Sequence, residues 1–329
     1  MPCPPPRRRD GSRHGTGDAT VQPVNVVVVG GAGFIGSHLV DRLLAEEHAV
    51  DVIDNLTVGS LANLAAARTA GGRLRIHHLD VPSSEAESSI GHRTPDVIFH
   101  LALLPRHDPS PSAQGDAFVS ALATLEAARR HGVPKVVVAL PASAIYGHPT
   151  SKQLPVKEGE PSQLEPRDVR GVVARAIIDL LVSYRDLHAI EFTALALGSV
   201  YGPRQRPDGG VVAAFVAAAT DGRSPVMYGD GRQTRDFVFI DDVVDALVRA
   251  GGRGSGLVIN VGTGEQTSIL ELWSKVSASI TGAGELEPTR GPARLHEVQR
   301  FAVSPVRARI HLGWSPWTGL DDGLARLLD

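Results

Sequence analysis

Three glycines at a regular spacing are the first residues of this sequence that point to chemistry. Gly30, Gly33 and Gly36 occur in "VVVVGGAGFIGSHLV", between an apolar β-branched run and a helical pattern. Glycine permits a tight turn there and lets backbone amides approach a pyrophosphate, which the amino terminus of a helix stabilises. Asp54 ends the next apolar run, about twenty residues on, where a carboxylate can accept hydrogen bonds from ribose hydroxyls. The spacing therefore predicts a dinucleotide site.

Asp54 also favours NAD over NADP. Its charge would repel a 2′-phosphate, and the following "NLTVGSLANL" contains no arginine that could bind one. Asp80, at the end of the next apolar run, could contact the adenine, or it could be an ordinary exposed aspartate at a strand end. We therefore expect NAD as the cofactor.

One pair of side chains could act as an acid and a base. His107 and Asp108, in "LLPRHDPS", follow the fourth predicted strand, at the edge of the sheet where open α/β folds bind ligands. A solvent-exposed loop pair is the alternative. The histidines predict no metal site, because His77 and His78 are neighbours in a strand and face opposite ways.

These residues have to be positioned by regular elements, and the sequence predicts a parallel sheet covered by helices. From residue 24, runs that are apolar on both faces alternate with helical patterns, which is typical of such a sheet. The runs are "VNVVVV", "AVDVI", "LRIHHL", "DVIFHL", "KVVVAL" and "EFTALAL". A late run, "LVINV", is expected to rejoin the sheet. We predict an α/β fold, with a doubly wound Rossmann domain over 24–202 completed by 236–262, and a smaller α/β substrate-binding lobe over 203–329.

Length, charge and composition exclude several classes of protein. The 329 residues are 42% hydrophobic and carry a formal net charge of −3, which argues against nucleic acid or an anionic membrane as the main partner. No apolar run approaches the roughly 20 residues that cross a bilayer. The single cysteine, Cys3, fits a reducing cytoplasm. Residues 1–23 are rich in Pro, Arg and Gly, and we predict a disordered extension there.

The motifs together resemble one family, the extended short-chain dehydrogenases, and within it the UDP-glucose 4-epimerase-like, NAD-dependent nucleotide-sugar epimerases and dehydratases. The resemblance runs from about residue 25 to the end and includes "GGAGFIG", "DNLTVGS", "AIYG", "SVYGPRQRPDGGVV" and "YGDGRQTRDFVFIDDVVDA". It implies an NAD-binding Rossmann domain and a C-terminal domain for a nucleoside diphosphate sugar. The further NAD contacts expected on this basis are Phe34, Ile35, Asn55, Val81, Leu101 and Ala102.

The family's catalytic residues are replaced in this chain. In the family, a tyrosine takes the sugar hydroxyl proton while hydride moves to NAD, a lysine four residues later lowers its pKa, and a serine or threonine hydrogen-bonds the same oxygen. Alignment places Arg170, Ala174 and Ala142 at these positions. Ser143 lies one step away and points elsewhere if the strand is regular. Arginine, with a pKa above about 12, cannot act as a base near neutral pH, and alanine has no ionisable group.

The helix that carries Arg170 offers no substitute for these groups. Residues 166–183 contain neither tyrosine nor lysine, and Tyr184 lies on the expected buried stripe. We therefore expect the conventional redox chemistry to be absent.

The resemblance also implies residues that contact the sugar nucleotide. The expected contacts are Tyr146, Ser199, Arg235 and Arg300. The two arginines match family positions near the diphosphate, where a planar guanidinium suits phosphate oxygens. Ser199 replaces a family asparagine. The alternative for Arg235 is an ion pair with Asp236 or Asp242.

Three functions remain open on this evidence. The first is a pseudoenzyme or partner subunit that keeps NAD and a sugar-nucleotide-like anionic ligand. The second is a repurposed biosynthetic isomerase, lyase or cyclase that uses His107, Asp108 and Arg170. The third is an ordinary UDP- or dTDP-sugar epimerase with an unexpected proton carrier. Arg170 favours an anionic ligand near the nicotinamide, which separates the first two from the third. The resemblance also implies a homodimer, paired through "GDAFVSALATLEAARRHG" and the 168–184 helix.

Overall fold

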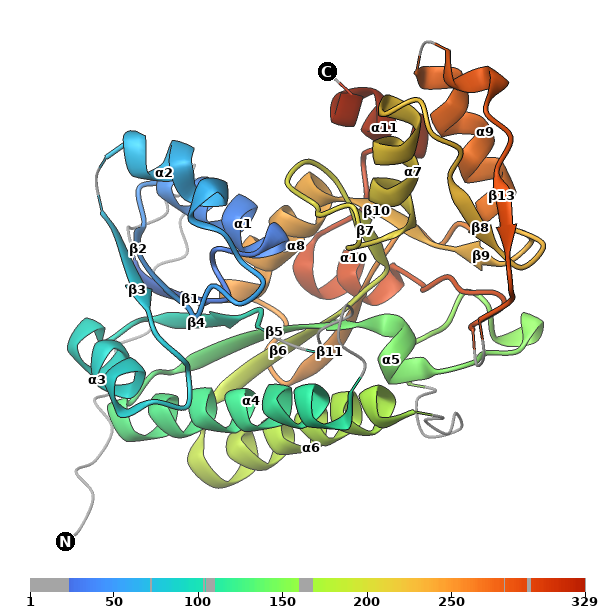
Figure 1. Cartoon of the computed structure of the whole chain (residues 1–329). Helices are drawn as coiled ribbons and strands as arrows, with labels where there is room; N and C mark the ends of the chain where they lie inside the picture. The colour runs from blue at the N-terminus through green and yellow to red at the C-terminus, as the bar shows by residue number, and fades with distance from the viewer. Residues whose placement is uncertain are drawn as a thin grey trace, which may run out of the picture.

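A parallel sheet forms the centre of the molecule (Figure 1), seen in a computed structural model that describes residues 24–71, 73–102, 104, 110–159, 168–280, 282–294 and 297–328. Over these residues the sheet has seven strands, in the order β11–β6–β5–β4–β1–β2–β3. The strands are β1 (Asn25–Val29), β2 (Ala49–Asp54), β3 (Leu74–His78), β4 (Val97–His100), β5 (Lys135–Pro141), β6 (Glu191–Leu197) and β11 (Leu257–Val261). All neighbouring pairs are parallel. The predicted Rossmann-like α/β fold is confirmed.

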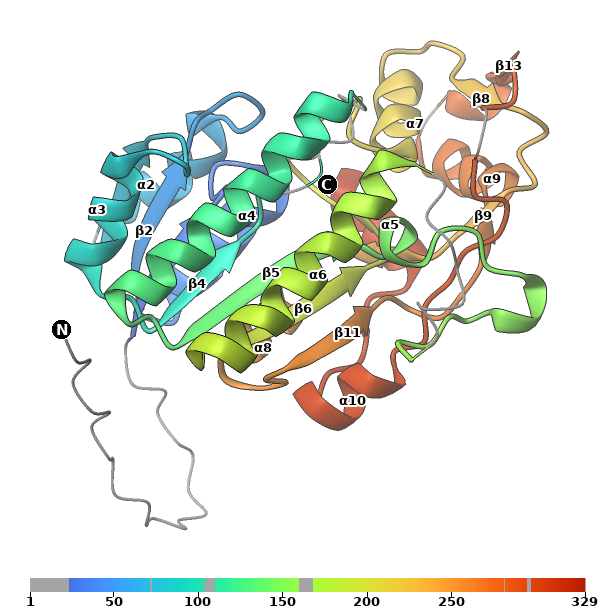
Figure 2. The same cartoon turned by 90° about the horizontal axis from the view of Figure 1, so that it is seen from below.

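Helices cover both faces of this sheet (Figure 2). The helices of the Rossmann part are α1 (Phe34–Ala45), α2 (Ala65–Thr69), α3 (Ser84–Arg93), α4 (Pro111–His131), α5 (Ala142–Tyr146), α6 (Val169–His188) and α8 (Ile240–Gly252), with 3-10 turns at Leu61–Leu64 and Ser151–Gln153. Helices α3, α4 and α6 pack along one face, and α1 and α8 pack on the other.

Strand β1 shows why these residues form a doubly covered sheet. Val26 and Val28 are fully buried in the cluster that includes α1 and α8. Val27 and Val29 point the other way, into the cluster that includes α3, α4 and α6. Side chains alternate between faces along a strand, so a continuous valine run buries apolar surface on both sides.

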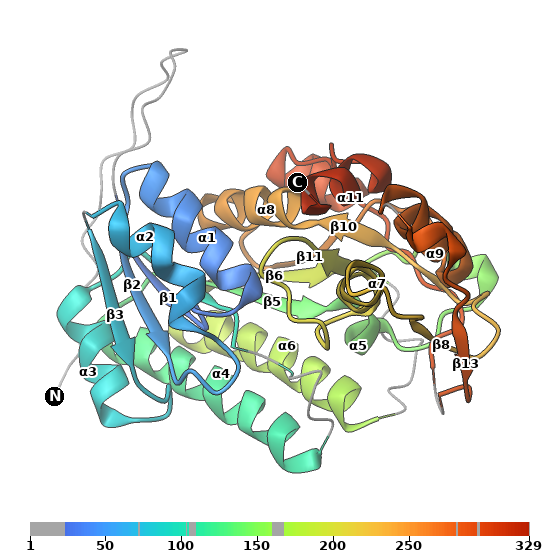
Figure 3. The ribbon, with the colours of Figure 1, turned by 45° about the horizontal axis from the view of Figure 1, so that its top comes forward.

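The remaining elements form a smaller lobe beyond the ends of β5 and β6 (Figure 3). They are β7 (Ser199–Tyr201), α7 (Val211–Thr220), β8 (Val226–Tyr228), β9 (Thr234–Arg235), β10 (Phe237–Phe239), β12 (Thr267–Ser268), α9 (Ile269–Ser279), a 3-10 turn at Ala283–Glu285, β13 (Thr289–Gly291) and α11 (Leu320–Leu328). Helix α10 (Val306–Leu312) belongs to the sheet instead, because it packs on β11 and α8. The described strands of this lobe form three short pairs, β7–β10, β8–β13 and β9–β12.

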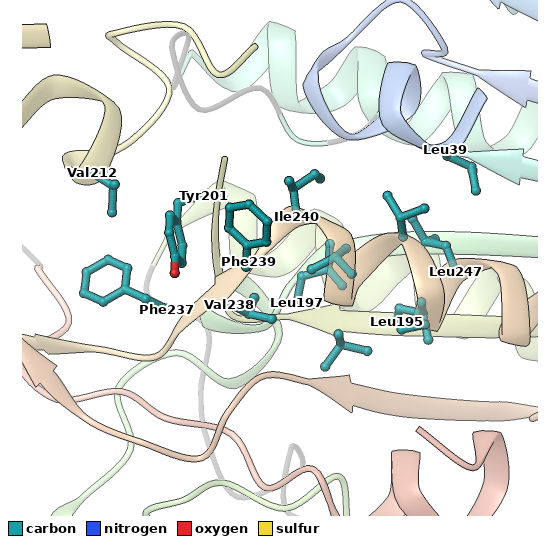
Figure 4. Packing of buried hydrophobic residues seen from close by; sticks show 14 of the residues in the cluster. Leu39, Leu195, Leu197, Tyr201, Val212, Phe237, Val238, Phe239, Ile240 and Leu247 are labelled. Carbon is teal, nitrogen blue, oxygen red and sulfur yellow. The ribbon is translucent and has the colours of Figure 1, made fainter. Parts of the chain in front are cut away.

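The lobe shares its core with the sheet. One apolar cluster runs from Leu39 on α1, past Ile240 and Leu247 on α8, to Tyr201 and Val212 in the lobe (Figure 4). The late strand "LVINV" is β11 and pairs with β6, as expected. The domain boundaries at 202 and 236–262 stay predictions, and the predicted disordered extension lies outside the described residues. None of the described helices is long and apolar enough to cross a membrane.

Candidate functional site

The glycine turn after β1 has the shape that a pyrophosphate needs. Gly30 has a φ of +78°, and a Cβ added to it would lie 2.9 Å from the backbone nitrogen of Ala102. A Cβ on Gly36 would lie 2.2 Å from the carbonyl oxygen of Gly30. Gly33 is the N-cap of α1, and no side chain in the described part of the chain caps that helix. Its first-turn amides are therefore positioned for a phosphate, so the residues present fit a dinucleotide.

Asp54 connects this turn to the loop that follows β2. Its carboxylate is buried and accepts hydrogen bonds from the amides of Ala32 at 2.9 Å and Leu56 at 2.8 Å. Two carboxylate oxygens have about four acceptor sites, so two remain for ribose hydroxyls. Sequence reasoning missed this second role, in which the carboxylate holds the glycine turn in place.

The other residues expected around the dinucleotide lie at the same edge of the sheet, where the strands end at their carboxyl termini. The side-chain amide of Asn55 donates to Asp80 at 2.6 Å, which joins the ends of β2 and β3. The expected contacts Phe34, Ile35 and Leu101 line one large cavity.

That cavity has a volume of about 760 Å³ and lies between the carboxyl ends of the strands and the smaller lobe. This volume is within the usual range for small-molecule sites, and the carboxyl edge is where open α/β sheets bind ligands. Its sheet-side wall comes from the ends of β5 and β6 and the first turns of α1, α5 and α6. Its lobe-side wall comes from α7, β8, β9 and the segment around residues 294–301.

Of the three residues predicted at the family's catalytic positions, Arg170 lines the cavity, whereas Ala142 and Ala174 do not. Arg170 is half-buried and lines the cavity from the first turn of α6, whose N-cap Asp168 accepts from the amide of Gly171 at 2.7 Å. Ala174, one turn later, and Ala142 are fully buried, and neither is among the residues that line the cavity. The residue that we predict at the family's tyrosine position therefore has its guanidinium at the cavity wall.

The expected direction of Ser143 is wrong, because the strand is not regular there. Pro141 ends β5 and the chain turns into the short helix α5. The side-chain repeat changes from that of a strand to that of a helix, so Ala142 points into the core and Ser143 lines the cavity. The Ser143 hydroxyl is therefore present next to Ala142, the position predicted to have lost the family's serine or threonine.

Tyr146, expected to contact the sugar nucleotide, is sequestered in the core. It is fully buried, and its hydroxyl donates to the Asn260 side chain at 2.6 Å. Asn260 in turn donates to the carbonyl oxygen of Val156 at 2.9 Å. Burial raises the pKa of the Tyr146 phenol well above its usual range, so this group holds the fold together near the site and does not exchange protons in it.

Of the remaining tyrosines and the lysines, Tyr228 alone lines the cavity formed by the described residues. Tyr184 lies on the buried face of α6, as expected, and donates to Glu126 on α4; burial raises its pKa to about 12. Burial also raises the pKa of Tyr201. Tyr228 lines the cavity from the lobe, with the guanidinium of Arg294 stacked 4.0 Å from its ring. All four lysines lie in the described residues, and none of them lines the cavity.

The arginines expected near the diphosphate are placed differently from one another. Arg235 lines the cavity and donates to Glu297 at 2.9 Å and to the carbonyl oxygen of Val298 at 2.6 Å. Glu297 is therefore its ion-pair partner, whereas Asp236 is fully buried and accepts from Thr263 at 2.6 Å.

Arg300 is not brought to the cavity. It is exposed, and it donates to the Ser151 hydroxyl at 3.3 Å. Ser199 does line the cavity, and so do Arg223 and Arg294, which sequence reasoning missed because their only signal is an arginine in a loop.

The described residues give no support to an acid–base or metal site built on histidine. His107 and Asp108 lie outside the described residues. His100 is fully buried beside the Thr124 hydroxyl at 2.9 Å, and burial lowers its pKa to about 3, so it is a neutral packed side chain. No group of three potential metal ligands occurs among the described residues.

Comparisons with known proteins agree on one family. Residues 26–262 match the model of the NAD dependent epimerase/dehydratase family. The chain is 40% identical over 319 residues to a UDP-glucose 4-epimerase of Mycolicibacterium smegmatis, covering 93% of this chain and 98% of that protein. A putative UDP-glucose 4-epimerase of Methanocaldococcus jannaschii is 33% identical, over 92% of this chain and 97% of its own length.

Solved structures are similar over nearly the whole chain. The UDP-glucose 4-epimerase of Thermotoga maritima with UDP-glucose superposes with a TM-score of 0.85 at 30% identity, covering 92% of this chain and 97% of that one. The Thermus thermophilus enzyme in complex with NAD gives 0.83 at 30% identity, covering 93% and 98%.

Proposed function

Because this chain belongs to the NAD-dependent epimerase/dehydratase family, we propose that it binds NAD on the glycine turn and a nucleotide sugar in the cavity, without the tyrosine–lysine redox chemistry. Its physiological role is then that of a binding protein or partner subunit. One observation carries the proposal: Arg170 lines the cavity, whereas Ala142 and Ala174 are buried behind it.

The missing step is removal of the sugar hydroxyl proton. NAD supplies a hydride acceptor when bound, but hydride leaves the sugar only if a base takes that proton. Arg170 is a cation at any physiological pH, and Ser143 is a neutral hydroxyl without an adjacent base among the described residues. These two groups can bind and orient a ligand, but neither can accept its proton.

The rest of the site supports retained binding. Gly30, Gly33 and Gly36 form the pyrophosphate turn, and Asp54 holds that turn while keeping acceptor sites for ribose. On the lobe side, Arg223, Arg235 and Arg294 line the cavity, and their guanidinium groups suit the oxygens of a diphosphate. The Thermotoga and Thermus relatives are described with UDP-glucose and with NAD, which supports the same two ligand classes here.

The proposal is tested by measuring binding and turnover on the same purified protein. We expect calorimetry to detect NAD and UDP, and product analysis with UDP-glucose, UDP-galactose and dTDP-glucose to find no turnover. Turnover at an ordinary enzymatic rate, on the order of 1 per second or faster, would overturn the proposal. Absence of both NAD and UDP binding would show that the site does not bind either ligand, and would also overturn the proposal.

A further inference from the structure

The loop between β7 and α7 forms part of the cavity wall. The loop residues that line the cavity are Gln205, Pro207, Asp208, Gly209 and Gly210. Gly210 is also the N-cap of α7, and no side chain in the described part of the chain caps that helix. The first turn of α7 lines the same cavity, so its uncapped amides can meet a phosphate oxygen. The fit of a nucleotide ligand therefore depends on where this loop is held.

Two contacts hold the loop against helix α1 (Figure 3). The guanidinium of Arg204 forms an ion pair with Asp41 at 2.7 Å. The Nε2 atom of His38 donates to the carbonyl oxygen of Pro203 at 3.0 Å. Arg204 and Pro203 are not among the described residues that line the cavity. They act on a ligand only through the position of the loop that follows them.

The two contacts lie on one face of α1. Phe34, His38 and Asp41 follow one another at spacings of four and three residues, so they share one side of the helix. Phe34 lines the cavity and packs edge-on against the His38 ring, with 5.9 Å between the ring centroids. Burial lowers the pKa of the His38 imidazole, so this ring is neutral near pH 7. The charged contact between the helix and the loop is therefore the pair of Arg204 and Asp41.

Arg204 adopts a backbone conformation that is unfavourable by itself. Its φ is +64°, in the left-handed region that a residue with a Cβ rarely enters. Its Nη1 atom is buried without a hydrogen bond to any described residue. Such unfavourable features persist where surrounding contacts hold them, and they gather at sites that need a fixed geometry. The pair with Asp41 is such a contact, because its side chains are only 27% and 30% exposed.

We propose that Arg204 is a positioning residue, which by pairing with Asp41 fixes the loop and the amino terminus of α7 where the cavity accepts a nucleoside diphosphate. The inference rests on the proposed nucleotide-sugar function and adds the contact that holds the wall around the ligand. Helix α1 then serves both ligands, since its first turn faces the dinucleotide and a later turn holds the loop.

The test changes the charges of the pair and measures UDP and NAD binding by calorimetry. Asp41→Arg brings two cations together, and we expect the affinity for UDP to fall about tenfold, in proportion to the fraction of molecules whose loop is held. Asp41→Asn is milder, because it adds no repulsion, and should lower the affinity about threefold. Asp41→Arg combined with Arg204→Asp restores an ion pair of reversed direction and should recover most of the UDP affinity. Aspartate also tolerates the left-handed conformation.

Glu46→Arg is the matched control. It makes the same change of charge on the same helix, at a side chain of similar exposure, 27% against 30%. The ion pairs of Glu46 are with Arg42 and His48, at the end of α1 away from the glycine turn. This variant should bind UDP as the unmodified protein does. All variants should keep their affinity for NAD, because the glycine turn and Asp54 are unchanged, and this shows that they are folded.

Each outcome decides the inference. A loss of UDP affinity in Asp41→Arg that the double change recovers supports it. An unchanged affinity in Asp41→Arg and Asp41→Asn, an equal loss in Glu46→Arg, a loss that the double change does not recover, or a parallel loss of NAD affinity overturns it and leaves the proposed function standing. Failure of UDP to bind the unmodified protein overturns the proposed function, and the inference with it.

Discussion

Arg170 is the residue on which the predicted loss of redox chemistry chiefly depends. Arg170 lines the cavity, and on the predicted alignment its guanidinium, which does not release its proton near neutral pH, stands where the family has a phenol. Ser143 lies beside it and Ala174 is buried one helical turn away. Two predictions follow from the identity of these side chains.

Restoring redox chemistry should require a tyrosine and a lysine together. Arg170→Tyr alone supplies a phenol whose pKa stays near ~10, so we expect no turnover of UDP-glucose. Adding Ala174→Lys supplies the ammonium, and we expect at least trace epimerisation, with Ser143 serving as the hydroxyl; Ala142→Ser is the further addition that the family alignment suggests. Because Ala174 is fully buried, this lysine should cost about 1–3 kcal/mol of stability. Chromatography of the sugar nucleotides and a thermal scan measure both effects.

The control for that restoration places the lysine elsewhere on the same helix. Arg170→Tyr with Ala176→Lys has the same composition but lacks the spacing of four residues that brings the two side chains together. If it turns over UDP-glucose as well as the variant with lysine at 174, the assigned positions are wrong.

The charge of Arg170 should also bias the oxidation state of the bound dinucleotide. A cation near the positive oxidised ring should weaken NAD⁺ relative to NADH by about 1 kcal/mol, or roughly fivefold, after solvent screening. NADP should bind poorly, because Asp54 repels its phosphate. Calorimetry on the cofactor-stripped protein measures all three, and Arg170→Gln should bring the affinities for NAD⁺ and NADH together. A preference for NAD⁺ in the unmodified protein would contradict the argument.

At the scale of elements, side chains form hydrogen bonds with the backbone of β11, the edge strand of the sheet. The amide of Asn260 donates to Glu158 at 3.0 Å, and Arg307 donates to the carbonyl oxygen of Val258 at 3.1 Å. These bonds occupy backbone groups that an edge strand would otherwise offer to another chain.

The amino ends of β5 and β6 contain a buried cation. Lys135 donates to the hydroxyls of Thr193 at 2.8 Å and Ser255 at 2.7 Å, and burial lowers the pKa of its ammonium to about 8. The ordinary lysine pKa is about 10.4. Between these two values the unfolded chain binds a proton that the folded chain has released, so stability rises with pH in this window.

We therefore expect the free energy of unfolding to increase by about 1–2 kcal/mol between roughly pH 7.5 and pH 9.5 through Lys135. Lys135→Met should remove this increase, and Lys152→Met, at an exposed site, should retain it. Urea titrations at the two pH values give the difference. An identical pH dependence of the Lys135→Met variant and the unmodified protein would rule out the argument.

At the scale of the whole molecule, the two apolar clusters on the faces of the sheet are accompanied by exposed apolar side chains on one side of the protein. Helices α4 and α6 lie side by side over one face of the sheet (Figure 2), and several of their exposed residues are apolar. The exposed apolar side chains on these helices are Val119, Val169, Val172, Val182 and Leu187. Surface of this kind is typical of an association site.

We expect a homodimer that buries this surface. Light scattering at micromolar concentration should give twice the chain mass of 34.7 kDa, and Val172→Glu should shift the protein to monomer by placing a charge in the interface. Ile310→Glu, at an exposed apolar residue on α10, is the matched control and should remain dimeric. A monomeric mass for the unmodified protein would refute the dimer.

Local sequence alone determined the strands of the sheet and the glycine turn, and it is the whole basis of the prediction that the catalytic groups are lost. The valine run of β1 is short, β-branched and apolar at every position, and it is followed by glycines, which together predict a strand covered on both faces. Gly36 is required by its contact with the carbonyl oxygen of Gly30 within one short turn, and Gly30 by its positive φ of +78°. Arg170 and Ala174 follow from residue identity and spacing, which need no knowledge of the fold.

Tertiary structure decided which side chains line the cavity. Ser143 enters the cavity because Pro141 ends β5 early, and Tyr146 leaves it because Asn260, more than a hundred residues later, accepts its hydroxyl. Arg294 lines the cavity where Arg300 was expected, since loop geometry sets their directions. Such outcomes depend on contacts between residues far apart in the chain, and no local pattern of residue types encodes them.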